Sequence, residues 1–282
     1  MAARKKVGYS ERDLSDGLIR FEGRHPWGIG VTAMVIASEG EAAVYDTLMF
    51  PSEGRRMARS IRDRGLRVKI LINSHWHIDH IGGNQFFPGR RLAHRLCPNL
   101  MKADAPGRKW AKKTWPREFH DYVLTLPNET LARRATVQVG KEKLIAFPTP
   151  GHTPDSISVL VKGARATLTA DAAMELPLIG TGDSGEYLRS LRTISRTPAA
   201  IIVQGHGKVV PRSKVRLDIA YLERCRATVR EAARSGASSA TVLPLPLAQF
   251  IGEKRAKEFS PVWKEIHSHN LSRISEEFGL SK

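Results

Sequence analysis

Cysteine is scarce in this sequence. Among its 282 residues only Cys97 and Cys225 are cysteines, and they lie far apart in the chain. A disulfide framework needs several paired cysteines, and a zinc knuckle needs closely spaced ones. Both kinds of scaffold are therefore excluded, and we expect the two residues to be buried thiols.

Long apolar runs are missing as well. No stretch approaches the roughly 20 apolar residues of a membrane-spanning helix, although the 41% hydrophobic fraction suffices for a sizeable core. The basic residues 1–9 are followed by Ser10-Glu11-Arg12-Asp13 and not by the apolar segment of a secretion signal. The sequence therefore predicts a globular protein without a membrane span, located in the cytoplasm.

Acidic residues are outnumbered by basic ones. Forty-five lysines and arginines against 28 aspartates and glutamates give a formal net charge of +17. The resulting positive field favours anionic small molecules, nucleic acid or acidic membrane surfaces as partners. The charge can also serve solubility alone, without any binding partner, because solubility requires only a net charge away from zero. Charge alone does not choose among these alternatives.

The first part of the chain has the pattern of strands around one helix. Residues 30–37 are apolar and β-branched, and residues 42–46 follow after a Glu39-Gly40 turn, which predicts a hairpin. Ser52 is a candidate cap for the helix that follows. Residues 68–72 then form a predicted buried strand that leads into a histidine-rich segment.

The second part repeats this pattern. Strands are predicted at 143–147, 156–161, 166–170 and 200–203, and a helix is predicted at 184–195. Asp183 and Glu186 fit a capping box at the start of that helix. The polar clusters of the sequence fall just after predicted strands, on loops, where α/β folds usually carry their chemistry.

Two further segments set the domain organisation. Residues 100–128 are basic and irregular and form a predicted insert, whereas helices are predicted from about 217 to 235 and from 261 to 280. We therefore expect a catalytic domain over residues 1–215. A helical C-terminal extension over residues 216–282 would pack on the same domain.

Six residues of the insert are candidates for substrate binding, because tryptophan faces and cations suit aromatic or anionic ligands. They are Lys109, Trp110, Lys112, Lys113, Trp115 and Arg117. The alternative is a solvated helix face whose tryptophans pack inward. Both interpretations fit the sequence of the insert.

The most informative segment carries three imidazoles and one carboxylate within six positions. It reads His75-Trp76-His77-Ile78-Asp79-His80-Ile81-Gly82-Gly83. In an extended chain His75, His77 and Asp79 would point to one side, while Trp76 and Ile78 would pack behind them. His80 would begin a turn that the two glycines permit. Imidazole and carboxylate are the ligands expected of a zinc site.

Three more candidate ligands follow predicted strands. They stand in Gly151-His152-Thr153, in Thr169-Ala170-Asp171 and in Gly205-His206-Gly207. A lone histidine or aspartate at such a position is more often structural, but a full set together with the first motif predicts a metal site. The other histidines lack a motif context, so we expect none of them to bind metal. They are His25, His94, His120, His267 and His269.

Together these motifs resemble the metallo-β-lactamase superfamily, with its H-x-H-x-D-H signature, a Gly-His-Thr third histidine, a strand-ending aspartate and a final Gly-His. The resemblance runs from about Gly30 to Val210. It implies an α/β fold, an αββα metallo-β-lactamase sandwich with a helical C-terminal extension. It also implies a metal site in a groove along one edge of the two sheets.

The resemblance further implies the ligands of two metal ions. The first ion is bound by His75, His77 and His152, the second by Asp79, His80 and His206, and Asp171 bridges both. Two zinc ions are the implied cofactor, with iron and manganese as alternatives. A metal-bridging hydroxide, oriented by Asp79, would be the nucleophile.

Departures from particular families narrow the activity. Asp171 is present and the motifs contain no cysteine, which disfavours an antibiotic-hydrolysing role, and His77 stands where flavodiiron proteins have glutamate. Asp171 instead resembles hydroxyacylglutathione hydrolases, lactonases and phosphodiesterases. We therefore expect a hydrolase that acts on a small-molecule carboxylic ester, lactone or thioester.

Three alternatives stay open. A phosphodiesterase or phosphotriesterase activity is the runner-up, because the +17 charge would favour an anionic substrate. A mononuclear iron persulfide dioxygenase would keep much of the same motif. A nucleic-acid-binding role without catalysis ranks last, and the sequence indicates no particular oligomeric state.

Overall fold

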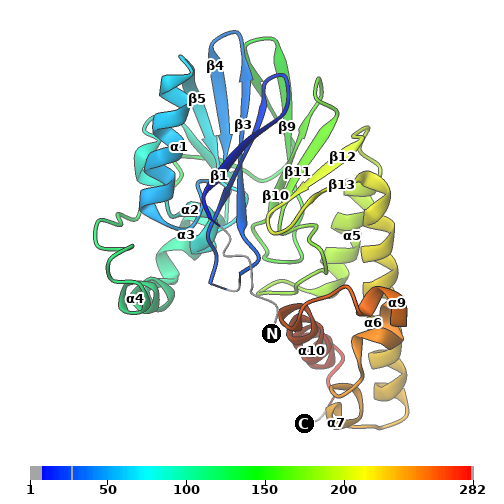
Figure 1. Ribbon diagram of the computed structural model, residues 1–282. Helices are drawn as coiled ribbons and strands as arrows, with labels where there is room; N and C mark the ends of the chain where they lie inside the picture. The colour runs from blue at the N-terminus through cyan, green and yellow to red at the C-terminus, as the bar shows by residue number, and fades with distance from the viewer. Residues whose placement is uncertain (1–7, 27, 281–282) are drawn as a thin grey trace.

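Two β-sheets packed face to face form the centre of the molecule (Figure 1). The computed structural model describes residues 8–26 and 28–280 of the chain. The basic residues 1–7, on which the predicted location partly rests, lie outside the described residues.

The first sheet has seven strands in sequential order. They are β1 (Ser10–Ser15), β2 (Leu18–Gly23), β3 (Val31–Ser38), β4 (Glu41–Tyr45), β5 (Arg67–Ile72), β6 (Arg91–His94) and β7 (Glu129–Leu131). Strands β1 to β4 are antiparallel neighbours, whereas β4 to β7 run parallel. The predicted hairpin is confirmed as β3 and β4, and its turn residues Glu39 and Gly40 have positive φ angles of 52° and 74°.

One helix joins the antiparallel half of this sheet to its parallel half. α1 (Pro51–Asp63) connects β4 to β5 and buries Met57 and Ile61. It begins one residue before Ser52, so the predicted cap is wrong. Pro51 takes the first helical position, where its fixed φ angle suits the helix and its missing N–H costs nothing.

The second sheet has six strands in the order β13-β12-β11-β10-β9-β8. They are β8 (Ala135–Val139), β9 (Glu142–Pro148), β10 (Ile157–Val161), β11 (Ala166–Ala170), β12 (Ile201–Gln204) and β13 (Val209–Pro211). β11 and β12 run parallel because α5 (Ser184–Ser195) connects them. Asp183 caps α5 by accepting a hydrogen bond from the Glu186 N–H over 2.8 Å, as the sequence predicts.

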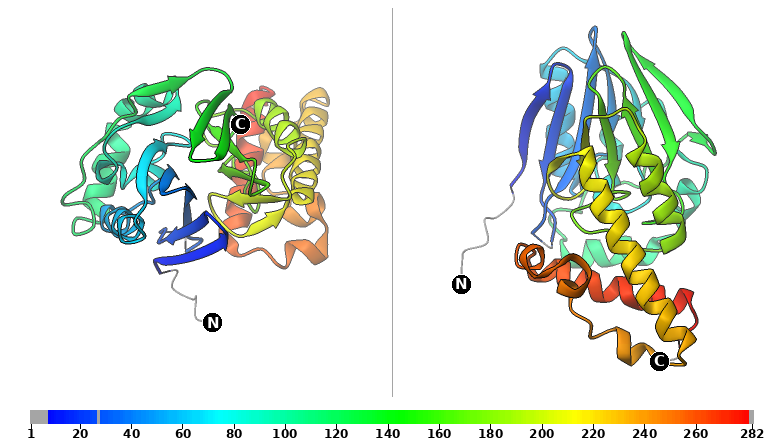
Figure 2. Two further views of the ribbon diagram at one scale, coloured as in Figure 1. Left: turned by 90° about the horizontal axis from the view of Figure 1, so that it is seen from above. Right: turned by 90° about the vertical axis from the view of Figure 1, so that its right-hand side faces the viewer.

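Apolar side chains from the inner faces of both sheets form the central core. Met34 and Ile72 of the first sheet belong to one buried cluster with Val137 and Leu168 of the second. Helix α1 covers the outer face of the first sheet, and α5 covers that of the second (Figure 2). This arrangement confirms the predicted αββα sandwich, which is stable because each sheet buries one apolar face against the other.

The basic insert is more regular than the sequence predicts. Residues 100–128 were expected to be irregular, yet α3 (Cys97–Ala103) and α4 (Ala105–Thr114) run through the first half of this range. The Asp104 carboxylate caps α4 by accepting a hydrogen bond from the Gly107 N–H over 3.1 Å. This capping contact stabilises the start of the helix, where the fixed φ angle of Pro106 is also favourable, and offsets the glycine in the first turn.

The C-terminal extension is helical, as predicted. After the short turn η2 (Arg212–Lys214), its helices are α6 (Val215–Arg234), α7 (Ser239–Val242), α8 (Leu247–Ile251), α9 (Glu253–Ala256) and α10 (Pro261–Glu277). Helix α6 packs along α5, and α10 packs against α6 and α7 (Figures 1 and 2). Tyr187 of α5 therefore shares one apolar cluster with Leu222 of α6 and with Leu271 and Ile274 of α10.

The structure bears on the predicted state of the cysteines and on the predicted lack of a membrane span. Both cysteines are buried and form no disulfide bond, as expected. Across the described residues, no helix combines the length and the apolar character that a membrane crossing requires.

Candidate metal centre

Five of the seven predicted ligands lie on loops that meet at one edge of the two sheets. His75 and His77 follow β5, His152 lies between β9 and β10, Asp171 follows β11 directly, and His206 follows β12. The first loop is held to both sheets, because Ser74 N–H donates to Asp46 Oδ1 over 2.7 Å and the Ser74 carbonyl accepts from Ile157 N–H over 2.8 Å. The edge is therefore built from strand ends of both sheets.

Asp79 and His80 reach the centre from a turn of helix. The extended chain ends at His77, and α2 (Ile78–Ile81) begins there. The prediction that Asp79 continues an extended segment is therefore wrong. Gly82 has an ordinary helical φ of −58°, so its backbone conformation does not require glycine. Glycine is required because a side chain at this position would collide with neighbouring backbone. A Cβ atom at Gly82 would lie 1.8 Å from the Met49 carbonyl oxygen.

Glycines before two of the histidines allow close approaches of the backbone. A Cβ at Gly151 would lie 2.3 Å from Cα of Tyr187, and a Cβ at Gly205 would lie 2.2 Å from Oδ1 of Asp171. No larger residue fits either position without a shift of the backbone or of a candidate ligand. Glycine therefore precedes His152 and His206 because a larger side chain would collide with neighbouring atoms.

The first cluster consists of His75, His77, His152 and Asp171. Each contributes one possible ligand atom, and these four atoms lie within 4.8 Å of one another. His152 Nε2 is 3.0 Å from His77 Nδ1 and 3.3 Å from Asp171 Oδ2. His75 Nε2 is buried and makes no hydrogen bond to any described residue. Burying such an atom without a partner is costly, which indicates that a ligand belongs there.

The second cluster shares Asp171 with the first. His206 Nε2 lies 3.1 Å and His80 Nε2 lies 3.5 Å from Asp79 Oδ2. Asp171 Oδ1 lies 3.4 Å from His80 Nε2, and Oδ2, which is close to His152 of the first cluster, also lies 3.6 Å from His206 Nε2. Neither His80 Nε2 nor Asp171 Oδ1 makes a hydrogen bond within the described part of the chain. The carboxylate of Asp171 is thus placed between two groups of nitrogen donors.

The outer nitrogens of three imidazoles are held by acceptors. His152 Nδ1 lies 2.7 Å from the Leu178 carbonyl oxygen, and His80 Nδ1 lies 2.9 Å from Asp46 Oδ2. His206 Nδ1 contacts the Gly30 carbonyl oxygen in the same way. Because a carbonyl or an ionised carboxylate only accepts hydrogen bonds, Nδ1 must be protonated. The Nε2 atom of each ring then faces the centre, as in metal-binding histidines.

Burial and charge set the protonation of the site. Burial, reinforced by the neighbouring histidines, lowers the pKa of His77 to about 3 and holds that of His75 well below its usual value. Burial acts against the ionised form of Asp171, but His206, His80 and His152 outweigh it and hold the pKa of that carboxyl well below its usual range. Neutral imidazole and ionised carboxylate are the forms that bind divalent cations. Burial acts against the charged forms of His80 and His206, but Asp79 and Asp171 outweigh it and raise the pKa of both rings. The donor set therefore fits a pair of such ions, provided that the second ion displaces the protons of these two rings.

A pocket of about 250 Å³ opens onto this centre. Its walls are apolar on several sides, with Met49, Trp76, Ile78, Trp110, Met174 and Leu178 contributing side chains. Among the described residues that line the pocket, none is a lysine or an arginine. The site therefore combines a polar floor of candidate metal ligands with an apolar rim.

The structure separates the six candidate substrate residues of the insert. Trp110 lines the pocket, and Trp115 packs edge-on against it at 4.9 Å while contacting Phe50. Lys109 and Lys112 line a different depression. Lys113 and Arg117 are exposed and, like the two other cations, are not among the described residues that line the site pocket.

Sequence reasoning missed His25. It lies between β2 and β3, with Nε2 3.6 Å from Asp79 Oδ2 and its ring 4.8 Å from that of His206. It forms a third group of possible ligands with those two residues. Burial is the largest cause that lowers the pKa of His25, which falls to about 4. No local signal marks this histidine, because its partners are distant in the sequence.

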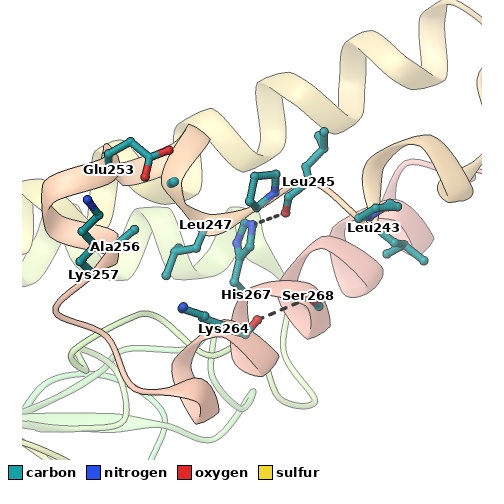
Figure 3. A pocket seen from close by; sticks show the side chains of 12 residues that line it. Leu243, Leu245, Leu247, Glu253, Ala256, Lys257, Lys264, His267 and Ser268 are labelled. Atoms are coloured by element: carbon teal, nitrogen blue, oxygen red, sulfur yellow. Dashed lines mark hydrogen bonds between the residues drawn. The ribbon is translucent and has the colours of Figure 1, made fainter.

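The other four histidines outside the motifs belong to none of the candidate metal clusters found among the described residues. Figure 3 shows one of them, His267, in the wall of a pocket of about 290 Å³ in the extension. Its Nδ1 lies 2.9 Å from the Tyr221 hydroxyl and its Nε2 3.1 Å from the Leu245 carbonyl oxygen. Both ring nitrogens are thus engaged within the extension.

Comparison with known proteins adds a family and several distant relatives. A family model described as the metallo-beta-lactamase superfamily matches residues 26–206. The atrochrysone carboxyl ACP thioesterase of Aspergillus fumigatus is 25% identical over 207 residues, which are 70% of this chain and 58% of that protein. The hydroxyacylglutathione hydrolase of Mesorhizobium japonicum is 24% identical over 186 residues, 64% of this chain and 63% of that protein. The chain thus spans about three fifths of the length of these relatives.

Solved structures resemble this chain in fold. The structure of TMB-1 superposes with a TM-score of 0.64 at 19% identity, covering 77% of this chain and 98% of that one. DIM-1 metallo-beta-lactamase gives a TM-score of 0.64 at 17% identity, covering 77% and 99%. At these identities the likeness concerns the sandwich alone.

Proposed function

This chain belongs to the metallo-beta-lactamase superfamily, and on that premise we propose that it is a two-metal hydrolase of carboxylic thioesters or esters, lactones included. A metal-dependent hydrolase agrees with the activities named for its relatives. The observation that carries the proposal is the position of Asp171, whose oxygens face His80 at 3.4 Å and His152 at 3.3 Å.

The proposed ligands divide between two ions. His75, His77 and His152 would hold the first, Asp79, His80 and His206 the second, and Asp171 both. We propose zinc, because imidazole-rich sites with carboxylates suit it, with iron and manganese as alternatives. Two such ions supply a hydroxide nucleophile at neutral pH and polarise the substrate carbonyl.

The residues of the chain have separate tasks in this proposal. Asp79 lies at the floor of the pocket, with Oδ2 3.1 Å from His206 Nε2, and would orient the attacking water. Asp46, Leu178 and Gly30 hold the imidazoles of His80, His152 and His206 with their Nε2 atoms inward. Met174, Leu178 and Trp110 would exclude water from the acyl side of the substrate.

The character of the pocket favours a neutral acyl group over a phosphodiester. The two ions would balance the charge of a reacting phosphate, but any anionic group further along the substrate would lose hydration in the apolar part of the pocket and would need cationic side chains there. Among the described lining residues there are none, since Lys109 and Lys112 face a different depression. The names of the relatives, a thioesterase and a hydroxyacylglutathione hydrolase, agree with an acyl substrate. The cytoplasm stays the proposed location, on the strength of the sequence.

A substrate panel tests the proposal. The zinc-loaded full chain is offered a neutral thioester, an ester, a lactone and a phosphodiester, and metal content is measured in the same preparation. We expect turnover of the acyl substrates to exceed that of the phosphodiester and to disappear on chelation. A phosphodiester preference, or one iron per chain with persulfide-dependent oxygen uptake, would overturn the proposal.

A wall residue supplies the matched variant. Trp110 is 56% exposed and lines the pocket, whereas Leu217 is 48% exposed on α6 and does not. Trp110→Ala should raise KM for a thioester with an apolar acyl chain by about tenfold, roughly the loss of one buried large apolar contact. Leu217→Ala should leave KM unchanged.

A further inference from the structure

One loop lies between the candidate metal centre and the C-terminal helix α10 and contacts both. Residues 172–183 run from Asp171 to α5, and they include Leu178. The Leu178 carbonyl oxygen accepts the hydrogen bond from His152 Nδ1 over 2.7 Å, and its side chain lines the site pocket. The placing of this one residue therefore affects both a proposed ligand and the substrate wall.

Asn270 of α10 binds the peptide groups on both sides of Leu178. Its Nδ2 donates to the Pro177 carbonyl oxygen over 2.6 Å, and its Oδ1 accepts from the Ile179 N–H over 2.9 Å. The orientation of the amide is fixed, because a carbonyl can only accept and an N–H can only donate. Asn270 is fully buried, and its Nδ2 also lies 3.1 Å from the Tyr221 hydroxyl.

The same loop is attached to His152 at its backbone. The N–H groups of Gly180 and Gly182 both donate to the His152 carbonyl oxygen, over 3.0 and 3.1 Å. A Cβ at Gly180 would lie 2.8 Å from that oxygen. On the other side, His269 Nε2 of α10 lies 2.9 Å from the Ile179 carbonyl oxygen. The loop is thus held between His152 and α10.

We propose that Asn270 is a positioning residue for His152, acting through the Leu178 carbonyl. The amide of Asn270 fixes the two peptide groups that flank Leu178, so the carbonyl stays where it holds the His152 ring with Nδ1 protonated and Nε2 inward. This inference rests on the proposed function, in which His152 is a metal ligand. Helix α10 lies outside residues 26–206, so this support comes from the extension of this chain and not from the part that the family model matches.

The physical reason lies in the outer hydrogen bond of a metal-binding imidazole. Losing the acceptor of that bond typically lowers metal affinity by about 10- to 100-fold, because the ring loses its fixed tautomer and direction. Asn270→Ala would leave the buried Pro177 carbonyl and Ile179 N–H without partners, and the loop would have to move to satisfy them. Any movement of Leu178 takes the acceptor away from His152.

Ile274 supplies the matched control. It lies one turn further along α10, is equally buried, and packs in the apolar cluster without a hydrogen bond from its side chain to the loop. Asn270→Ala and Ile274→Ala should both lower the melting temperature of the metal-free protein. Asn270→Asp serves as a second variant of unchanged size, which keeps the acceptor for Ile179 N–H but cannot donate to Pro177.

The test is zinc binding measured by competition with a chromogenic chelator on the full chain, which does not depend on knowing the substrate. We expect Asn270→Ala and Asn270→Asp to weaken one of two zinc-binding steps by at least about tenfold. Ile274→Ala should keep both steps within about twofold of the wild type.

Three outcomes contradict the inference in distinguishable ways. Wild-type zinc affinity in both Asn270 variants would overturn it and leave the proposed function standing. Equal weakening in the Asn270 and Ile274 variants would also overturn it, because general destabilisation would then be the cause. A wild-type protein that binds no divalent metal would overturn the proposed function and this inference with it.

Discussion

The Nδ1 atom of His80 lies 2.9 Å from Oδ2 of Asp46, and both side chains are completely buried. Asp46 directly follows β4 with a φ angle of 62°, a left-handed conformation that few residues other than glycine adopt. Its other oxygen accepts the Ser74 N–H over 2.7 Å. Strained backbone of this kind persists where the surrounding structure fixes it, often beside functional groups.

This pair leads to the first prediction. Asp46→Asn keeps the size of the side chain but removes the negative charge that holds the His80 imidazole with Nε2 inward. We expect affinity for the second metal to fall by about 10- to 100-fold, as measured by chelator competition. The same substitution at Asp63, which is exposed at the end of α1, is the control. Unchanged affinity in Asp46→Asn would show that His80 needs no partner.

The second prediction compares Asp171 with His206. Asp171 faces both clusters, whereas His206 belongs only to the groups around the second. Asp171→Ala should therefore reduce bound metal at both sites, while His206→Ala should chiefly empty one. Elemental analysis after gel filtration distinguishes one remaining equivalent from a general loss. Full occupancy in Asp171→Ala would remove this residue from the ligands.

The third prediction concerns His25. Its Nε2 is 3.6 Å from Asp79 Oδ2, so it adds a nitrogen donor beside the second cluster. We expect His25→Ala to weaken the second metal by about tenfold and to leave the first unchanged. His120 is an exposed histidine remote from the clusters, and His120→Ala is the control. If His25→Ala binds both metals with wild-type affinity, His25 lines the pocket but is not a ligand.

The fourth prediction separates basic charge from substrate contact. Lys109, Lys112, Lys113 and Arg117 are exposed and lie outside the lining of the site pocket. Replacing all four with glutamine should leave kcat and KM for a neutral thioester unchanged. An anionic substrate should lose at most about threefold in kcat/KM at low salt, and salt should abolish this difference by screening. A tenfold rise in KM that persists in high salt would place these cations at the substrate.

The fifth prediction concerns stability at acidic pH. Burial lowers the pKa of His267 to about 4, although its hydrogen bond to the Leu245 carbonyl works in the other direction. Since the unfolded histidine titrates near its ordinary value of 6.5, the unfolded chain binds the extra proton as pH falls. The stability that neutral His267 contributes is therefore complete above pH 6.5 and is lost towards pH 4.

The measurement for this prediction uses two pH values. In urea unfolding of the metal-free protein, the free energy of unfolding should fall further between pH 7 and pH 5 in the wild type than in His267→Gln. The comparison cancels the histidines of the metal centre, which both proteins share. Glu253, Lys257 and Lys264 line the pocket beside His267 and also stay unchanged between the two proteins. Parallel pH curves would show that His267 titrates normally in the folded state.

Much of the fold and of the candidate ligands could be predicted because the signals are local. The apolar runs before Asn73, Asp171 and Gln204 marked β5, β11 and β12 within a few residues of their ends. Asp183 marked the start of α5 because its capping contact spans only three residues. The details that failed were also local, and the conformation of Asp79 is one of them. His77 ends the extended chain there, where sequence spacing fits both an extended segment and a helical turn.

Contacts between distant residues could not be predicted in this way. Asp46 and His80 are 34 positions apart, Leu178 and His152 are 26 apart, and Asn270 and Ile179 are 91 apart. Nothing in the sequence around Asn270 distinguishes the positioning role proposed for it from that of any other buried asparagine. Its role depends on where α10 packs against the loop that follows Asp171.

The sequence by itself determined the chemical groups of this site, because imidazoles and carboxylates at strand ends are written in short motifs. Only the tertiary structure decided which nitrogen of each ring faces inward, since that depends on acceptors such as the Leu178 carbonyl. It also decided the character of the pocket. Helix α4 buries Ala111 and packs at its C-terminal end through Trp115. This packing turns Trp110 towards the candidate metal centre and leaves Lys112 and Lys113 in solvent. The direction in which a helix faces its neighbours is fixed by packing, and composition alone does not contain it.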